Sequence, residues 1–167
     1  GSLEFYDGSA WISTNLIPSV DSVTGTIYVA NASNLTITVS NSTDTVDVVY
    51  KEGATTVATV TGQTVSSGSI TTAVPSAVYG QTSGDTMVIS VLNADGTPSS
   101  NAVSKTVIGL PSGGTLTTSG SYRIHSFTSS SNLVVPSGLT LSNVEYLVIA
   151  GGGSGGSNNG GGSGGGG

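Results

Sequence analysis

The side chains most able to do chemistry in this sequence are few and widely separated. His125 is the only histidine, and the chain has no cysteine. A serine nucleophile needs a histidine base and an acidic partner, yet no serine here lies in the glycine-flanked turn that exposes such a nucleophile. His125 instead shares an alternating, strand-like segment with Phe127, which favours a packing role. We therefore predict no catalytic residue.

The carboxylates could in principle serve glycoside hydrolysis, which needs two of them about 5–10 Å apart across a groove. The nine acidic residues are scattered along the chain: Glu4, Asp7, Asp21, Asp44, Asp47, Glu52, Asp85, Asp95 and Glu145. Asp44, Asp47 and Asp95 could offer oxygen ligands to Ca²⁺, but no calcium-loop spacing accompanies them. Exposed turn carboxylates are the simpler interpretation. The sequence predicts no metal site and no cofactor, and a glycan-active enzyme is the least favoured alternative.

Three aromatic residues are candidates for contact with a glycan or with another subunit. Tyr6 and Trp11 flank Asp7-Gly8, a dipeptide that predicts a hairpin between two aromatic strands. Tyr79 follows at some distance, where it is also a candidate corner tyrosine of a β-sandwich. Sugars stack on exposed aromatic faces, although core packing would explain each of these residues more economically. A two-stranded hairpin is marginal in water by itself, so residues 1–16 must lean on a neighbouring domain or on another chain.

Charge and composition exclude several classes of partner. Only 7% of the residues are charged, and the net charge is -6 with Lys51, Lys105 and Arg123 as the only Lys or Arg. Binding to nucleic acid or to an anionic membrane surface requires clustered Lys and Arg. No segment approaches the roughly 20 apolar residues of a membrane span. Solubility therefore rests on the many Ser, Thr and Asn side chains, which is typical of an extracellular or virion-surface β protein.

Short alternating segments with turns between them fill the first two thirds of the chain. They recur at roughly 8–12-residue spacing without helical periodicity. The expected strands are Val20–Val23, Thr26–Val29, Leu35–Val39, Val46–Tyr50, Val57–Thr61, Ser69–Val74, Thr86–Leu92 and Ala102–Ile108. In the segment 86–92, Met87, Ile89 and Val91 share one face. This pattern predicts an all-β fold, a β-sandwich of the immunoglobulin-like or fibronectin-III-like kind.

Composition divides the chain into five expected parts. They are an aromatic arm or hairpin (1–16), the sandwich (17–109), a linker (110–119), a small β unit (120–150) and a glycine-rich tract (151–167). In the small unit, strands are expected at 121–128, 133–135 and 140–149, and the Thr-rich residues from 115 onward could already belong to it. The tract contains only Gly, Ser and Asn. It is either a flexible spacer or a set of close-packed extended glycine helices. It offers no nucleotide signal, since any glycine run satisfies glycine motifs trivially.

Two stretches resemble proteins of bacterial viruses. Tyr122, Ile124, His125 and Phe127, followed by Val144–Val148 and Gly151–Gly153, resemble the glycine-rich domain of tail-fibre and other virion proteins of phages, especially phages of marine bacteria. The segment Leu3–Ser13 (LEFYDGSAWIS) is similar to the N-terminal part of many phage fibre proteins. The two matches cover less than a third of the chain. The family pattern continues through a longer glycine-rich region, so we expect this sequence to be a piece of a longer protein.

The resemblance implies a structural and adhesive role on the virion surface rather than an enzyme. It implies a tail fibre that contributes to host attachment, with other virion proteins as partners, a homotrimeric assembly and a host surface glycan as a further partner. Two alternatives stay open: a capsid decoration or head-fibre protein, and a bacterial surface adhesin or extracellular filament subunit. The adhesin would exchange strands through an exposed sheet edge such as 35–40.

Overall fold

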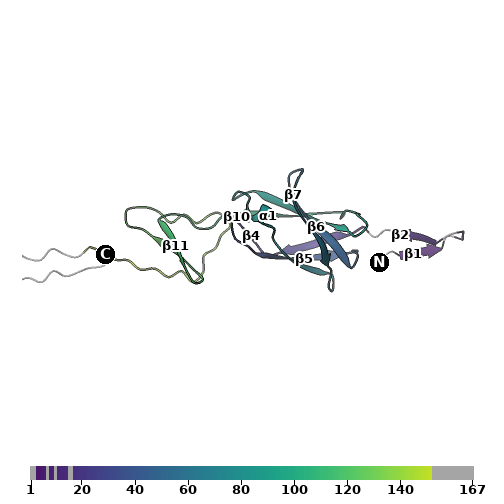
Figure 1. Ribbon diagram of the computed structural model, residues 1–167, viewed down its shortest axis with the longest axis horizontal. Helices are drawn as coiled ribbons and strands as arrows, with labels where there is room; N and C mark the ends of the chain where they lie inside the picture. The colour runs from purple at the N-terminus through teal and green to yellow at the C-terminus, as the bar shows by residue number, and fades with distance from the viewer. Residues whose placement is uncertain (1–2, 7, 10, 15–16, 152–167) are drawn as a thin grey trace, which may run out of the picture.

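The computed structural model describes residues 3–6, 8–9, 11–14 and 17–151, and in the strands 3–6 and 11–14 it describes the side-chain surroundings of Tyr6 alone. The described chain is all-β apart from one helical turn, which confirms the predicted fold class. Three β units follow one another along the long axis of the molecule (Figure 1). They are a hairpin, a two-sheet sandwich and a second, smaller hairpin unit.

The sandwich contains two sheets. One has three antiparallel strands in the order β3-β5-β8: β3 (Ser19–Thr24), β5 (Asn34–Ser40) and β8 (Ser69–Ala73). The other has five strands in the order β4-β10-β9-β6-β7: β4 (Ile27–Tyr28), β10 (Val103–Ile108), β9 (Thr86–Asn93), β6 (Thr45–Glu52) and β7 (Thr55–Thr64). Only the pair β4–β10 is parallel within these sheets.

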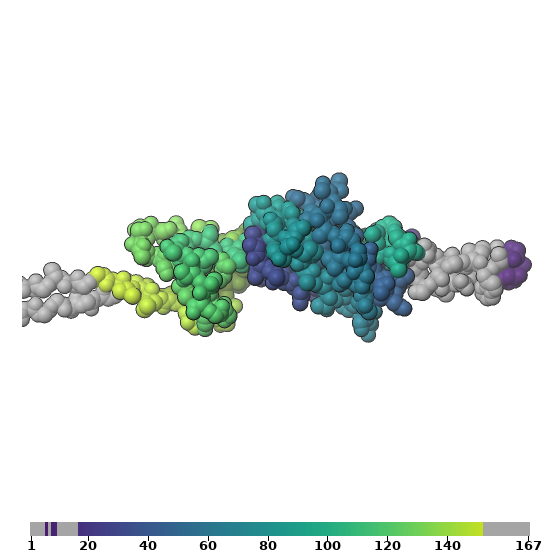
Figure 2. Space-filling model, in the orientation of Figure 1, coloured from purple at the N-terminus to yellow at the C-terminus, as the bar shows by residue number. Residues whose placement is uncertain are grey.

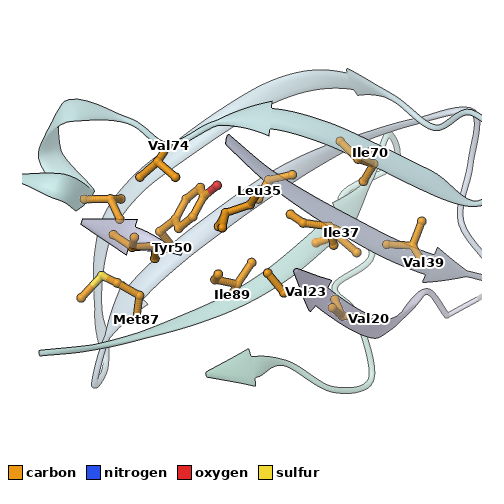
Figure 3. Close-up of a cluster of buried hydrophobic side chains, with 14 of the residues drawn as sticks. Val20, Val23, Leu35, Ile37, Val39, Tyr50, Ile70, Val74, Met87 and Ile89 are labelled. Carbon is orange, nitrogen blue, oxygen red and sulfur yellow. The ribbon is translucent and has the colours of Figure 1, made fainter. Parts of the chain in front are cut away.

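Alternation along the strands builds the core between the sheets. In β5, Leu35, Ile37 and Val39 are buried while the threonines between them face outward or lie half-buried. In β9 the predicted face with Met87 and Ile89 is the buried one. The period of two places every second side chain in the space between the sheets, where Figure 3 shows them gathered. All the buried hydrophobic side chains of the described chain lie between residues 20 and 107.

The predicted strands are present, but two details differ from expectation. The segment 35–40 was expected at an exposed edge, and this is wrong: β5 pairs with β3 on one side and β8 on the other. The edge strands are β4 and β7 in the five-stranded sheet and β3 and β8 in the three-stranded sheet. Pro75 ends β8 as expected, and a short helix α1 (Ser76–Tyr79) then follows, which no periodicity had indicated. One turn of helix is too short to produce a periodic signal.

The N-terminal hairpin is confirmed. Strand β1 (Leu3–Tyr6) pairs antiparallel with β2 (Trp11–Thr14), so that Tyr6 lies opposite Trp11. Asp7 of the predicted turn lies outside the described residues, while Gly8 next to it has a positive φ of 101°. That left-handed conformation suits glycine and supports the tight turn that the Asp-Gly pair predicts.

The second unit is smaller than expected. Strand β11 (Thr115–Ser119) pairs with β12 (Tyr122–Ser126), so the expected linker 110–119 is wrong over its second half. Thr-rich sequence favours a strand once a partner is adjacent. The expected strands 133–135 and 140–149 are also wrong: Val134 makes a single bridge to Ser112, and residues 140–151 belong to no strand. Here β-propensity is present, but the described chain supplies no neighbouring strand to pair with.

Gly25 supplies a direct test of the turn between β3 and β4. Its φ is 96°, and a Cβ at this position would lie 2.6 Å from the backbone oxygen of Asn34. We expect Gly25→Ala to lower the free energy of unfolding by about 2–3 kcal/mol, since strain and overlap add. Gly53→Ala is the matched control, because Gly53 also has a positive φ, of 55°, but has open space around a Cβ. Urea denaturation of both variants checks this, and equal losses would contradict the role of the overlap.

Tyr50 gives the sandwich a predictable response to alkaline pH. Its side chain is fully buried, and its hydroxyl has no hydrogen-bond partner among the described residues. Burial raises the pKa of Tyr50 to about 12 from 10.0. Because the folded-state pKa exceeds the unfolded one, this group's contribution to stability is complete below about pH 10 and is lost as the pH rises toward 12.

We therefore expect Tyr50→Phe to be at least as stable as the wild type at pH 7, since it removes an unsatisfied buried hydroxyl. Between about pH 10 and 12 the variant should lose less stability than the wild type. Urea midpoints of the two proteins across this range measure the difference. If the stabilities of the wild type and the variant change in parallel with pH, the prediction is contradicted, because Tyr50 would then have the same pKa in the folded and unfolded states.

Candidate functional site

The predicted contact residues are not brought together. Tyr6 is 56% exposed on the N-terminal hairpin, opposite Trp11 in the strand pairing. Tyr79 is half-buried at the end of α1 and packs against the sandwich core, while its backbone oxygen accepts a hydrogen bond from Ala30 N at 2.8 Å. The hairpin and α1 lie toward opposite ends of the sandwich (Figure 1). Tyr6 thus offers an exposed aromatic face, and Tyr79 serves mainly the core.

A shallow groove lies where the sandwich meets the second unit. Its volume is about 660 Å³, and its walls come from four regions of the chain. Val29 and Ala30 follow β4, Gln81, Thr82 and Ser83 come from the loop after α1, the connection 109–114 forms another wall together with Leu116, and Arg123 and His125 come from β12. No sequence motif signals this groove, because its polar residues come from a loop and a strand that lie far apart in the chain.

Local hydrogen bonds hold the groove together. Ser83 Oγ accepts a hydrogen bond from Gly109 N at 2.9 Å, where the sandwich ends. His125 Nδ1 lies 2.8 Å from the backbone oxygen of Gly113. Since a carbonyl can only accept, Nδ1 carries the proton and donates. His125 Nε2 is buried without a partner among the described residues, so no serine contacts it as a nucleophile would contact its base.

Most of the carboxylates whose contacts are described serve turns and strand ends. Asp47 accepts a hydrogen bond from Gly62 N and Asp85 accepts one from Thr82 N, both at 2.8 Å. Asp95 accepts one from Thr97 N at 2.8 Å within its turn. Asp21 accepts from the hydroxyls of Ser19 and Ser40. Among the described residues, no three His, Cys, Asp or Glu side chains gather as metal ligands would.

The most unusual surface of the described chain is apolar and belongs to the second unit. Between residues 110 and 151 no side chain is buried. Thirteen large hydrophobic residues in this span are exposed: Leu116, Tyr122, Ile124, Phe127, Leu133, Val134, Val135, Leu141, Val144, Tyr146, Leu147, Val148 and Ile149. In the sandwich, residues 17–109, Ile17 alone is exposed to this degree. Within this set Tyr146, Leu147, Val148 and Ile149 follow one another directly, and contiguous exposed apolar surface marks an interaction site.

The second unit is attached to the sandwich through a few tight contacts. A Cβ on Gly138 would lie 2.9 Å from Ile108 Cδ1, and one on Gly109 would lie 3.0 Å from Pro136 Cγ. Ser112 and Val134 exchange two backbone hydrogen bonds of 3.0 and 2.8 Å. These contacts hold residues 134–138 beside the end of β10. Beyond them, the chain runs out as a single extended segment, drawn in yellow in Figure 2.

No known protein family, no curated protein and no solved structure matches this chain. Within the part of the chain that the structure describes, no helix has the length and apolar character needed to cross a membrane. Function must therefore be argued from the composition, the sequence resemblance and the surface just described.

Proposed function

We propose that this chain is a structural and adhesive component of a phage virion, a tail fibre that contributes to host attachment. The observation that carries the proposal is the second unit, whose 42 residues from 110 to 151 include none that is buried. A unit without a core gains too little from burial to offset the entropy of ordering. Such a unit makes physical sense as part of a larger assembly, where partners supply the missing contacts.

The arrangement of β units in a row supports the same proposal. We infer that the sandwich is an immunoglobulin-like module that acts as a spacer. Strands β3, β5 and β8 share one sheet while β4, β6, β7, β9 and β10 share the other, a distribution comparable to that of immunoglobulin folds. A low charge and a surface rich in hydroxyls suit the exterior of a particle. In this proposal the protein carries no reaction centre.

The proposed partners are other virion proteins and further copies of the chain in a homotrimer. A host surface glycan is the proposed ligand of the adhesive role, with Tyr6, Trp11 and Tyr79 as its candidate contacts. The side chain of Tyr6 is 56% exposed, and the face of an aromatic ring is the part that stacks on a sugar. Tyr79 is half-buried and is therefore a weaker candidate than Tyr6.

A bacterial surface adhesin or filament subunit is the second candidate, and one observation favours it. The edge strand β7 has ten residues, TTVATVTGQT, without a charge or a proline. Edge strands usually carry such residues to prevent pairing with another chain. An open edge of this kind could accept an added strand from a neighbouring subunit.

Immunogold electron microscopy of purified phage particles, with antibodies against residues 17–109, tests the proposal. Label along the tail or its fibres is the expected result. Label on the head would instead favour a capsid decoration or head-fibre protein. A protein that is absent from the particle but present on the bacterial surface would overturn the virion role and favour the adhesin.

A further inference from the structure

The segment 144–149, here named the apolar segment, is exposed to an extent that a folded chain rarely tolerates. Tyr146 is 87% exposed, and Leu147 and Ile149 are both 83% exposed. Its backbone makes no hydrogen bond with any other described residue. Yet its composition of Val, Tyr, Leu and Ile is that of a buried strand. An extended apolar segment without a partner in the described chain indicates a binding site whose other half is missing.

Neither groove of the described chain holds this segment. The larger one combines polar walls from Gln81, Thr82 and Ser83 with apolar walls from residues such as Leu110 and Leu116, and the smaller one, of about 260 Å³, is lined mainly by Gly, Ser and Thr. Alternation also gives the segment two apolar sides, with Tyr146 and Val148 on one and Leu147 and Ile149 on the other. A single flat surface could cover only one of these sides.

We propose that the apolar segment packs against the same segment of neighbouring copies of this chain, side by side and parallel around a common axis. From Tyr146 to Gly167 the sequence contains no charged side chain, so identical copies can approach along residues 146–149 without charge repulsion. Glu145, the last charged residue, is exposed at the start of the segment. The glycines that follow allow close approach of the backbones near an axis.

The two apolar sides indicate a ring of copies rather than a pair. In a two-fold dimer one patch meets itself and the opposite side would stay exposed, whereas in a closed ring each copy has two neighbours. The exposed side chains of the segment amount to roughly 700 Å² per copy, taking a large side chain as about 150–200 Å². Divided between two neighbours, this is roughly 350 Å² per contact, so the other exposed apolar residues of the second unit must add to it to reach the ~800 Å² per partner of a stable interface. The inference rests on the proposed function for its homotrimer and adds the surface that forms it.

The absence of cysteine from the chain allows a clean test. Leu147→Cys introduces a single thiol at the centre of the segment, and Ile17→Cys introduces one at an apolar position of the sandwich that is 57% exposed. A disulfide forms only when the two Cα atoms come within about 7 Å. In a three-membered ring with one thiol per chain, a disulfide joins two chains and leaves the third thiol unpaired. Under mild oxidation of the full chain, we therefore expect up to about two thirds of the Leu147→Cys chains to be cross-linked. We expect Ile17→Cys to remain uncross-linked.

A second variant weakens the proposed apolar contact between copies, whereas the cysteine variant only detects it. Leu147→Glu should raise the concentration at which the chain associates by at least tenfold, measured by sedimentation velocity, and should leave the circular dichroism of the distant sandwich unchanged. If the wild type sediments as a trimer but Leu147→Cys does not cross-link, the inference fails and the proposed fibre survives through another contact. A wild type that sediments only as a monomer overturns the inference, and immunogold labelling of virions then decides the proposed function separately.

Discussion

Ile37→Ala is expected to lower the free energy of unfolding of the sandwich by about 3–4 kcal/mol. Ile37 is fully buried at the middle of β5, opposite Ile70 of β8, so its truncation leaves a cavity that the two flanking strands cannot close. For a sandwich of this size, such a loss corresponds to a fall of more than 10 °C in the melting temperature. Urea denaturation and thermal circular dichroism measure both quantities.

Leu116→Ala is the matched control for this prediction. Leu116 is 45% exposed on β11 of the second unit, and truncation of an exposed side chain usually changes stability by less than about 0.5 kcal/mol. A loss below about 1 kcal/mol for Ile37→Ala, or a comparable loss for Leu116→Ala, would contradict the assignment of the core to residues 20–107.

The largest effect is expected when the chain is divided after Gly109. Residues 17–109 contain every buried hydrophobic side chain of the described chain, so this piece should fold cooperatively and melt within a few degrees of the whole protein. Residues 110–151 contain no buried side chain. A two-stranded hairpin alone is at best marginal in water, so as a monomer this piece should show little amide dispersion by NMR and no cooperative melting transition.

A cooperative transition in the isolated piece 110–151 at micromolar concentration and monomeric mass would contradict this division. It would show that the second unit has a core of its own and needs no partner. The absence of a cooperative transition in the piece 17–109 would also contradict this division, because the folding of the sandwich would then depend on the second unit.

The sandwich could be predicted from sequence because the patterns that indicate its strands and turns span only a few residues each. Alternation in the segments around Leu35 and Met87 indicates which side chains face inward, and Pro75 and Gly53 mark strand ends and turns. The order of the strands within the sheets depends on contacts far apart in the chain. For this reason the segment 35–40 was expected at an edge but lies in the middle of its sheet.

The second unit shows the opposite case, in which propensity alone misleads. Residues 140–149 have the composition of a strand, yet a strand forms only where another strand is adjacent. The described chain pairs 115–119 with 122–126 and supplies no neighbour for 140–149. The sequence pattern therefore predicted a strand where the described chain forms none.

The groove beside His125 could not be predicted, since its walls come from four regions spread between residues 29 and 125. The hairpin of Tyr6 and Trp11 could be, because an Asp-Gly turn between aromatic strands is a local signal. Tyr79 was expected as a corner tyrosine of the sandwich, but the helical turn that it ends, where it is half-buried, was not expected. A single turn of helix depends on its packing against the core rather than on its own sequence.

Multi-angle light scattering of the full chain across a range of concentrations tests most directly whether this protein is built for assembly. At concentrations above the association threshold we predict a particle of three times the 16.3 kDa chain mass. A particle of one chain mass at every concentration would contradict the account, because the apolar surface of the second unit would then be stable in water without a partner.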